Sequence, residues 1–146
     1  MLDILSFDID HTLTEREHMA STDAPGPAPE SHLPLPPATF QILLALVDAE
    51  RHGYAIMKEV AAHSAGAVRL GPGTLYGALE RLLEAGLVAE AEERADPALN
   101  DERRRYYRLT EFGLAVVRAE ARRLEAMLRL ARRKHLVGPE PAGARP

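Results

Sequence analysis

The order of hydrophobic patterns between residues 53 and 109 limits the fold of this chain more than any other feature. Apolar side chains recur at helical spacing over residues 53–63 and again over 72–86. Residues 87–92 then alternate between apolar and polar, as in a half-buried strand, and residues 104–109 form a second strand-like run. Two short helices followed by a hairpin predict a mainly α domain with a small β-hairpin, a fold of the α+β class.

A third short helix is expected over residues 38–49, with Pro36 and Pro37 at its entry. The apolar positions expected to face the core share helical spacing within each helix: Phe40, Leu43, Leu44 and Val47; Tyr54, Ile56, Met57 and Val60; Leu75, Leu79, Leu82 and Leu83. The outer face of the helix before the hairpin consists of Thr74, Gly77, Arg81 and Glu84. That helix therefore presents a polar surface to solvent.

Residues 111–134 show the most regular periodicity in the chain. Their apolar positions follow 3-4-3-4-3 spacing: Leu114, Val117, Ala121, Leu124, Leu128 and Ala131. This is the a/d pattern of a coiled-coil seam. A helix of about 24 residues extends roughly 36 Å, which is longer than a small domain needs for its own core. The pattern favours the seam of a homodimer, and packing across the chain's own domain is the alternative.

The flanks differ from the central part in composition and charge. Residues 1–36 begin acidic, become proline-rich and carry a net charge of −6, so a flexible leader is expected. Residues 138–146 are expected to form a disordered tail. The expected domain over 37–110 and the helical segment over 111–137 together hold sixteen Lys and Arg against fourteen Asp and Glu. Because local clusters decide phosphate binding, the overall charge of −4 does not exclude nucleic acid as a partner.

Composition excludes several classes of function. The absence of cysteine excludes disulfides, thiolate catalysis and cysteine-ligated metals. There is no apolar run of membrane-spanning length and no signal-peptide pattern, so a cytoplasmic protein without membrane contact is expected. The six histidines lack metal-ligand spacing, and Gly71-Pro72-Gly73 lacks the lysine of a phosphate-binding loop. No metal, cofactor or enzymatic activity is expected.

The helix over 72–85 is the candidate for reading DNA, since the major groove admits one α-helix between two rows of phosphates. Thr74 and Tyr76 lie near its N-terminus, where helices favour anions, and Arg81 follows on the outer face. Each of the first two also has a structural interpretation. Instead of contacting DNA, Thr74 could serve as the N-cap of the helix. Tyr76 could be a packed ring whose hydroxyl is hydrogen-bonded within the protein.

The return strand of the hairpin begins with three consecutive arginines: Arg103, Arg104 and Arg105. Side chains alternate between the faces of a strand, so at least one of the three is expected to project outward. Guanidinium groups suit phosphate oxygens and narrow minor grooves. The alternative is a solvated charge run that pairs with Asp101 and Glu102. Arg69, just before the reading helix, is a further phosphate-binding candidate.

Residues 4–14 (ILSFDIDHTLT) resemble the first motif of haloacid-dehalogenase-type phosphatases. In that family the first aspartate attacks phosphorus, the second acts as acid and base, and magnesium is held beside them. The matching residues here are Asp8 and Asp10, but His11 stands in place of the usual glycine. The family also needs later strands with a lysine and paired acids, whereas a proline-rich stretch and a helical domain follow here. Phosphatase activity is therefore a remote alternative.

Three stretches resemble the PadR family of bacterial transcriptional regulators: HGYAIMKEV (52–60), VRLGPGTLYGALERLLEAGLV (68–88) and DERRRYYRLTEFG (101–113). The resemblance implies a winged helix-turn-helix followed by a long C-terminal dimerisation helix. It also implies a DNA-binding repressor that is released by a small aromatic or drug-like molecule. Thr74 and Tyr76 would contact DNA, and the three arginines would lie on the wing. Gly77, the lack of tryptophan and the proline-rich leader depart from the family pattern.

The sequence thus predicts a homodimer that binds double-stranded DNA and represses transcription. A winged-helix module that mainly binds other proteins is the alternative, because the central part of the chain is only mildly basic.

Overall fold

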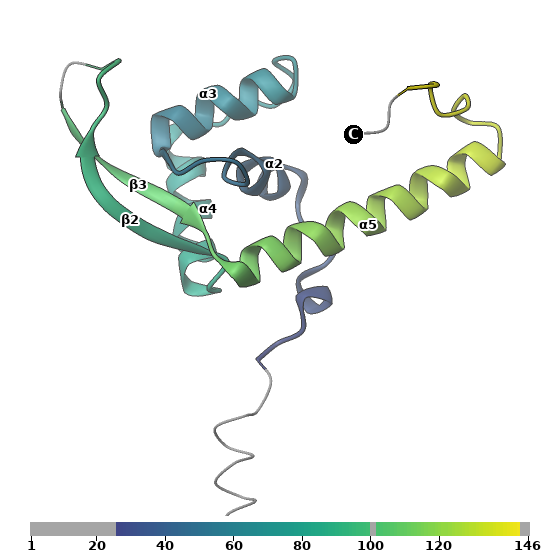
Figure 1. Cartoon of the computed structure of the whole chain (residues 1–146), viewed down its shortest axis with the longest axis horizontal. Helices are drawn as coiled ribbons and strands as arrows, with labels where there is room; N and C mark the ends of the chain where they lie inside the picture. Colours follow the sequence, from purple (N-terminus) through teal and green to yellow (C-terminus); the bar gives the residue numbers. More distant parts are fainter. Residues whose placement is uncertain (1–25, 100–101, 144–146) are drawn as a thin grey trace, which may run out of the picture.

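The computed structural model of the chain describes residues 26–99 and 102–143. Figure 1 shows the short helices and the hairpin in one body, from which the last helix extends. The predicted class, mainly α with a small β-hairpin, is confirmed. The elements are η1 (Pro29–His32), α2 (Pro37–Ala45), β1 (Arg51–His52), α3 (Gly53–His63), α4 (Pro72–Glu84), β2 (Val88–Ala95), β3 (Arg103–Leu109) and α5 (Glu111–Arg133).

The sheet is antiparallel, with β3 in the centre and the strand order β1-β3-β2. Val88 pairs with Leu109 at one end of the hairpin, and β1 joins β3 through Arg51 opposite Tyr107. Between Ala91 and Arg94 the register shifts, because three steps along β2 match two along β3. Such a bulge bends and twists a hairpin. The strand β1 was not predicted, since two residues are too few to show an alternating pattern.

The core lies between the short helices, the hairpin and the first half of α5. Its fully buried large side chains include Ile42, Leu43, Ile56, Val60, Leu75, Leu79, Leu87 and Val116. Two expectations about burial are wrong. Val47 is 48% exposed because α2 ends at Ala45, two residues earlier. Tyr54 is 44% exposed because Ile56 and Val60 define the inner face of α3.

The helix α5 begins where the chain approaches its own backbone closely. The Thr110 side chain accepts the N–H of Gly113 (2.9 Å) as an N-cap, and its hydroxyl lies 2.6 Å from the Gly86 carbonyl, to which it donates. A Cβ on Gly113 would overlap the carbonyl oxygen of Leu87 and lie 2.8 Å from Leu109 Cδ1. Only glycine allows this approach, so α5 starts in a fixed position against the end of α4 and the start of β2.

Residues 29–36 belong to the packed structure, although their composition placed them in the leader. The backbone N–H of Leu35 donates to the carboxylate of Glu120 on α5, and the ring of His32 meets Phe112 edge-on at 5.5 Å. Glu120 is buried and is also paired with Arg123. Leu33 and Leu35 of this segment pack against the hydrophobic core, which includes Val116 and Val117 of α5.

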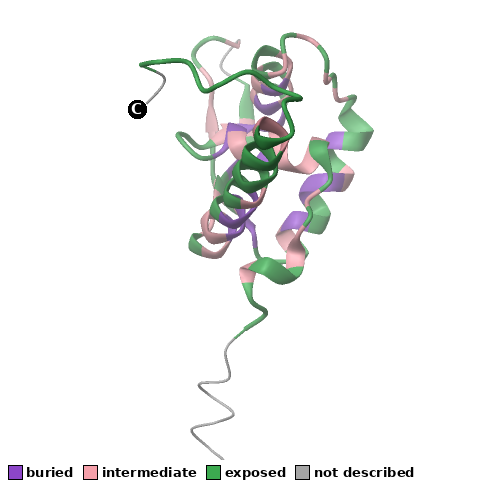
Figure 2. Cartoon of the chain, turned by 90° about the vertical axis from the view of Figure 1, so that its right-hand side faces the viewer, coloured by how far each residue is buried: buried purple, intermediate pink, exposed green. Residues whose placement is uncertain are grey.

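The second half of α5 extends beyond the body of the molecule. The first seam positions, Leu114 and Val117, are half-buried and buried in the chain's own domain. The later ones leave the core: Ala121, Leu124 and Leu128 are exposed, and Ala131 is half-buried. Figure 2 shows this half of α5 with an exposed surface, coloured green. The first part of the seam therefore packs in the chain's own domain, whereas a dimer seam over the later part stays a prediction.

Candidate nucleic-acid interface

The N-terminus of α4 is open to solvent. Gly71 is its N-cap, Pro72 lies in its first turn, and no side chain caps it. Thr74 is exposed two residues after the helix begins, so the interpretation of Thr74 as the N-cap is wrong, because Pro72 fixes the start of the helix earlier. Backbone N–H groups in an uncapped first turn remain free to meet an anion.

Tyr76 is both packed and exposed. A Cβ on Gly53, the first residue of α3, would lie 2.8 Å from Tyr76 Cζ, so the ring rests on the backbone of α3. The residue nevertheless keeps 49% of its surface exposed. It lines a hollow of about 290 Å³ between α4 and the hairpin, together with Leu79, Glu80, Leu83, Glu90, Arg105 and Tyr107. The tyrosine thus joins the two helices while one side of its ring faces the hollow.

Two further candidates flank α4. Arg69 is exposed in the segment before it, and Arg81 is exposed on the helix itself. The Arg81 guanidinium lies 3.6 Å from the position of a Cβ on Gly77, so the glycine gives the side chain room to lie along the helix. Neither arginine is in a salt bridge with another residue of the described part of the chain.

The three hairpin arginines differ in their surroundings. Arg103 donates to the Glu93 carbonyl at 2.7 Å. Arg104 is half-buried and lies 3.5 Å from Glu102, and its Nε has no hydrogen-bond partner among the residues that the structure describes. The side chain of Arg105 is 64% exposed and lies 3.4 Å from Glu90. Arg105 is therefore the best placed to reach a ligand, while the expected pairing with Glu102 is present for Arg104. Asp101 lies outside the described residues.

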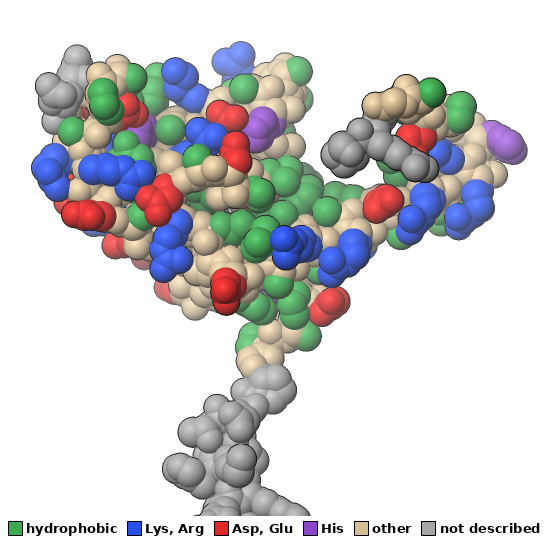
Figure 3. Space-filling model, in the orientation of Figure 1, with side chains coloured by type: hydrophobic (Ala, Val, Ile, Leu, Met, Phe, Trp, Pro, Cys, Tyr) green, Lys and Arg blue, Asp and Glu red, His purple; other side chains and the backbone are tan. Residues whose placement is uncertain are grey.

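Acidic and basic side chains are mixed over this surface. Figure 3 shows blue and red groups side by side around the hairpin, on the left of the molecule. Exposed ion pairs contribute about 0–1 kcal/mol each, so phosphates can compete for these arginines. Within the hollow, burial raises the pKa of Tyr107 above its usual value, although a hydrogen bond with Arg105 opposes the shift. The Tyr107 hydroxyl is therefore a neutral donor at physiological pH.

Two basic side chains near this surface were missed by the sequence analysis. Arg94 on β2 lies over the ring of Tyr106, 3.6 Å from its centroid, and pairs with Glu50 at 2.9 Å. Lys58 is exposed on α3, with its Nζ 5.7 Å from the centroid of the Tyr54 ring. Their spacing in the sequence gave no signal, because each stands alone among acidic or apolar neighbours.

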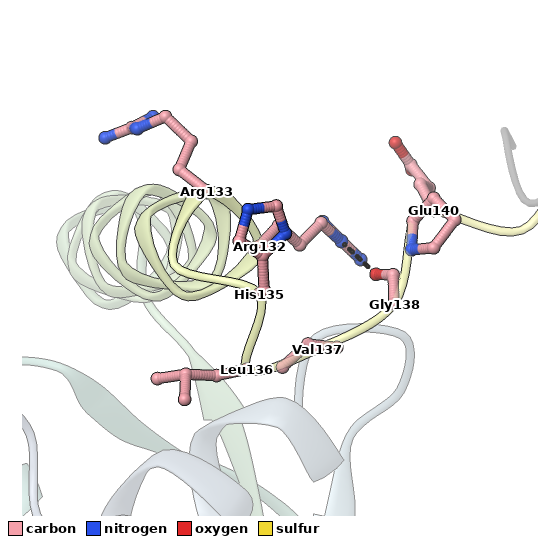
Figure 4. A pocket seen from close by; sticks show the side chains of 8 residues that line it. Arg132, Arg133, His135, Leu136, Val137, Gly138 and Glu140 are labelled. Atoms are coloured by element: carbon pink, nitrogen blue, oxygen red, sulfur yellow. Dashed lines mark hydrogen bonds between the residues drawn. The ribbon is translucent and has the colours of Figure 1, made fainter.

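Another hollow lies away from this surface, at the end of α5. It measures about 700 Å³ and is lined by Arg132, Arg133, His135, Leu136, Val137, Gly138, Pro139 and Glu140. Figure 4 shows the chain turning back there, with Arg132 donating to the Gly138 carbonyl at 3.2 Å. The hollow is open and formed mostly by the turn of the chain itself.

Other expectations concern absences. Within residues 26–99 and 102–143, no helix combines the length and apolar character needed to cross a bilayer. The same ranges contain no group of three His, Asp or Glu side chains arranged to hold a metal ion. The phosphatase-like motif over residues 4–14 lies outside the described residues.

Comparisons with known proteins agree with this geometry. The family model "Transcriptional regulator PadR-like family" matches residues 42–119. The transcriptional regulator Rv3488 of Mycobacterium tuberculosis (strain ATCC 25618 / H37Rv) is 34% identical over 101 residues, which cover 68% of this chain and 88% of that protein. An uncharacterized 37.1 kDa protein in transposon TN4556 of Streptomyces fradiae is 39% identical over 99 residues. The match covers 66% of this chain but only 24% of the transposon protein.

Solved structures share the fold. A PadR family transcription regulator from hypervirulent Clostridium difficile R20291 superposes with a TM-score of 0.54 and is 22% identical, over 66% of this chain and 95% of that one. At this identity the likeness concerns the fold alone, and it confirms the predicted winged helix.

Proposed function

Because the chain belongs to the PadR-like family of transcriptional regulators, we propose that it represses transcription as a homodimer on double-stranded DNA. We further propose that a small aromatic or drug-like molecule releases it. In each protomer α4 enters the major groove through Thr74, Tyr76 and Arg81. Arg69 and the hairpin arginines bind the flanking backbone, with Arg105 making the main contact.

One observation carries this proposal: the polar face of α4 and the apolar stripe of α5 are both exposed on one rigid unit. The stripe contains Leu124, Met127 and Leu128, with exposed fractions of 41%, 56% and 39%. Figure 3 shows hydrophobic surface above the middle of α5, where the helix leaves the body. A second copy would cover this stripe and bring two α4 helices to one duplex, as twofold operators require.

The effector part of the proposal is supported by a hollow of about 390 Å³ beside the seam. Its walls combine the apolar Leu46, Val47, Leu109 and Leu114 with three acidic side chains and one basic side chain: Asp48, Glu50, Glu111 and Arg108. Such walls suit a planar aromatic molecule, and a cationic one better than an anionic one. Leu114 also belongs to the predicted seam, so an occupant would influence the dimer. Titration of aromatic cations against a protein–operator complex tests this, and retention of the operator at every concentration would contradict it.

A salt titration of DNA affinity tests the main proposal, after selection of preferred fragments by the purified protein. The logarithm of affinity should fall with the logarithm of salt by about 0.9 per neutralised phosphate. Joint replacement of Arg103, Arg104 and Arg105 with alanine should weaken binding to every sequence and flatten the slope. The matched control removes three charges from α5 instead, at Arg122, Arg129 and Arg133. If both triple variants changed the DNA affinity and its salt dependence equally, the hairpin would not be part of the DNA interface.

A module that mainly binds proteins is the second candidate, since each hairpin arginine already contacts a carboxylate or a carbonyl of its own chain. A protein-binding module would bind DNA only weakly, and its DNA affinity would not change with salt concentration.

A further inference from the structure

His52 connects two parts of the molecule that are far apart in the sequence. It lies at the junction of β1 and α3 and is only 2% exposed. Its Nδ1 accepts the N–H of Ala55 at 3.2 Å and so caps α3, while its Nε2 lies 2.8 Å from Asp96 Oδ2. Because Nδ1 accepts, the proton of the neutral ring is on Nε2, which donates to Asp96.

Asp96 directly follows β2 and shapes the connection to β3. Its second oxygen, Oδ1, accepts the N–H of Ala98 at 2.9 Å, which forms an Asx-type turn. The hydrogen bond from His52 and the Ala98 N–H hold the pKa of Asp96 below its ordinary value of 3.8, so the carboxylate is ionised at neutral pH. One carboxylate thus forms the turn and ties it to the start of α3.

Neighbouring side chains support this link on both sides. The ring of Tyr106 on β3 meets the His52 ring edge-on at 5.3 Å. The guanidinium group of Arg94 on β2 lies over the face of the same Tyr106 ring. Tyr54 of α3 lies nearly parallel to His52 at 6.5 Å. His52 pairs with Tyr106 at the end of β1, just before the bulge, whereas Arg94 and Asp96 lie beyond the bulge.

A two-stranded hairpin is marginally stable by itself. Beyond Tyr106, Arg103 and Arg104 pair only with β2 and Arg105 lies opposite the bulge, so the direction of this end depends on contacts with the helices. Groups that bind a ligand lose affinity when they must first be ordered. A tie between the turn and α3 therefore determines whether the arginines stand ready for the DNA backbone.

We propose that His52 and Asp96 form a latch that positions the hairpin arginines relative to α3 and α4, and that both are positioning residues for DNA binding. The inference rests on the proposed DNA-binding function. Neither residue needs to touch DNA: His52 is buried, and Asp96 carries the charge that phosphates repel.

Asp96→Asn tests the latch because two effects act in opposite directions. Removal of a negative charge near the hairpin should strengthen DNA binding by electrostatics alone. Loss of the latch should weaken it. An asparagine cannot replace both bonds, since its single amide oxygen can serve either His52 Nε2–H or the Ala98 N–H. Glu92→Gln is the matched control, because it also removes one negative charge, from an exposed acid of β2 itself.

His52→Ser provides the second variant. Serine keeps an N-cap for α3 but is too short to reach Asp96, so circular dichroism should show the helices retained. We expect both latch variants to bind operator DNA about tenfold more weakly, equal to about 1.4 kcal/mol, and with a flatter salt slope. The amide hydrogens of residues 94–96, 98 and 99 should exchange faster than in the wild type. Glu92→Gln should match the wild type in hydrogen exchange and bind no more weakly.

The possible failures are distinct. A wild type that ignores duplex DNA at low salt would contradict the proposed function. A wild type that binds while Asp96→Asn binds as tightly as Glu92→Gln would contradict the latch alone. Faster exchange in both latch variants with unchanged affinity would also overturn it, because the tie would then exist without positioning the arginines.

Discussion

The exposed stripe of α5 gives a quantitative prediction at Leu124. This side chain is 41% exposed in the single chain, so a second copy can bury a further two fifths of it. Full burial of a leucine contributes about 1.5–3 kcal/mol, and the remaining part therefore about 1 kcal/mol. The residue occurs twice in a twofold dimer. Leu124→Ala should thus cost the dimer about 2 kcal/mol, or roughly 30-fold in its dissociation constant.

Leu124→Asp should have a much larger effect, since each buried carboxylate adds several kcal/mol of lost hydration. Sedimentation over a range of concentrations should then show monomers where the wild type is dimeric, together with weaker operator binding. Ala126→Asp is the matched control, because it places the same charge two residues away at an exposed position off the seam. Equal dissociation constants for the two aspartate variants would refute the placement of the seam.

Three further predictions concern the fold and the hairpin. Glu90→Gln releases Arg105 from its 3.4 Å pair and should tighten DNA binding about two- to fivefold, since such a pair contributes up to about 1 kcal/mol; unchanged affinity in a filter-binding titration would show that Arg105 makes no phosphate contact. Gly113→Ala forces a Cβ against the Leu87 carbonyl and should lower the free energy of unfolding by about 2–4 kcal/mol, whereas Gly138→Ala, where the Cβ meets nothing, should not change chemical denaturation. The pKa of Asp96 is lowered in the folded state, so its contribution to stability is present above pH 3.8 and is lost as pH falls through the folded pKa; Asp96→Asn should remove this part of the acid sensitivity, and identical acid unfolding curves would contradict it.

Helical periodicity located most of the fold because each helix has enough residues to repeat its pattern. The predicted helix over 53–63 matches α3, and the start at Pro72 is that of α4. The elements that were missed had no such repeat. The strand β1 consists of two residues, and η1 lies among prolines whose composition resembles a linker. Tertiary contact with Glu120, about 85 residues away, orders that segment.

The candidate site was harder to predict than the fold. The arginines of β3 stand out as a run, but the sequence does not show that Arg105 is exposed and that Arg104 is half-buried. Which arginine side chains of the hairpin are buried depends on the position of the bulge, and that position follows from the pairing of β3 with β2 and β1. The His52–Asp96 bond joins residues 44 positions apart, and neither residue is part of a recognisable spacing. Such contacts follow from how elements pack, which local patterns do not specify.

The junction between α4 and α5 determines how the two α4 helices of the proposed dimer would be oriented toward an operator. Thr110 binds the carbonyls of Gly86 and Leu87 and caps α5 through Gly113, while Gly113 itself contacts Leu87. Since Leu87 lies only three residues after the end of α4, the angle between α4 and α5 is fixed by backbone contacts rather than by flexible side chains. In the proposed dimer the seam then sets the separation of the two α4 helices, which must match about 34–36 Å for successive major grooves. A substitution at this junction should therefore change the preferred spacing of operator half-sites, whereas a substitution on the outer face of α4 should change the bases within each half-site.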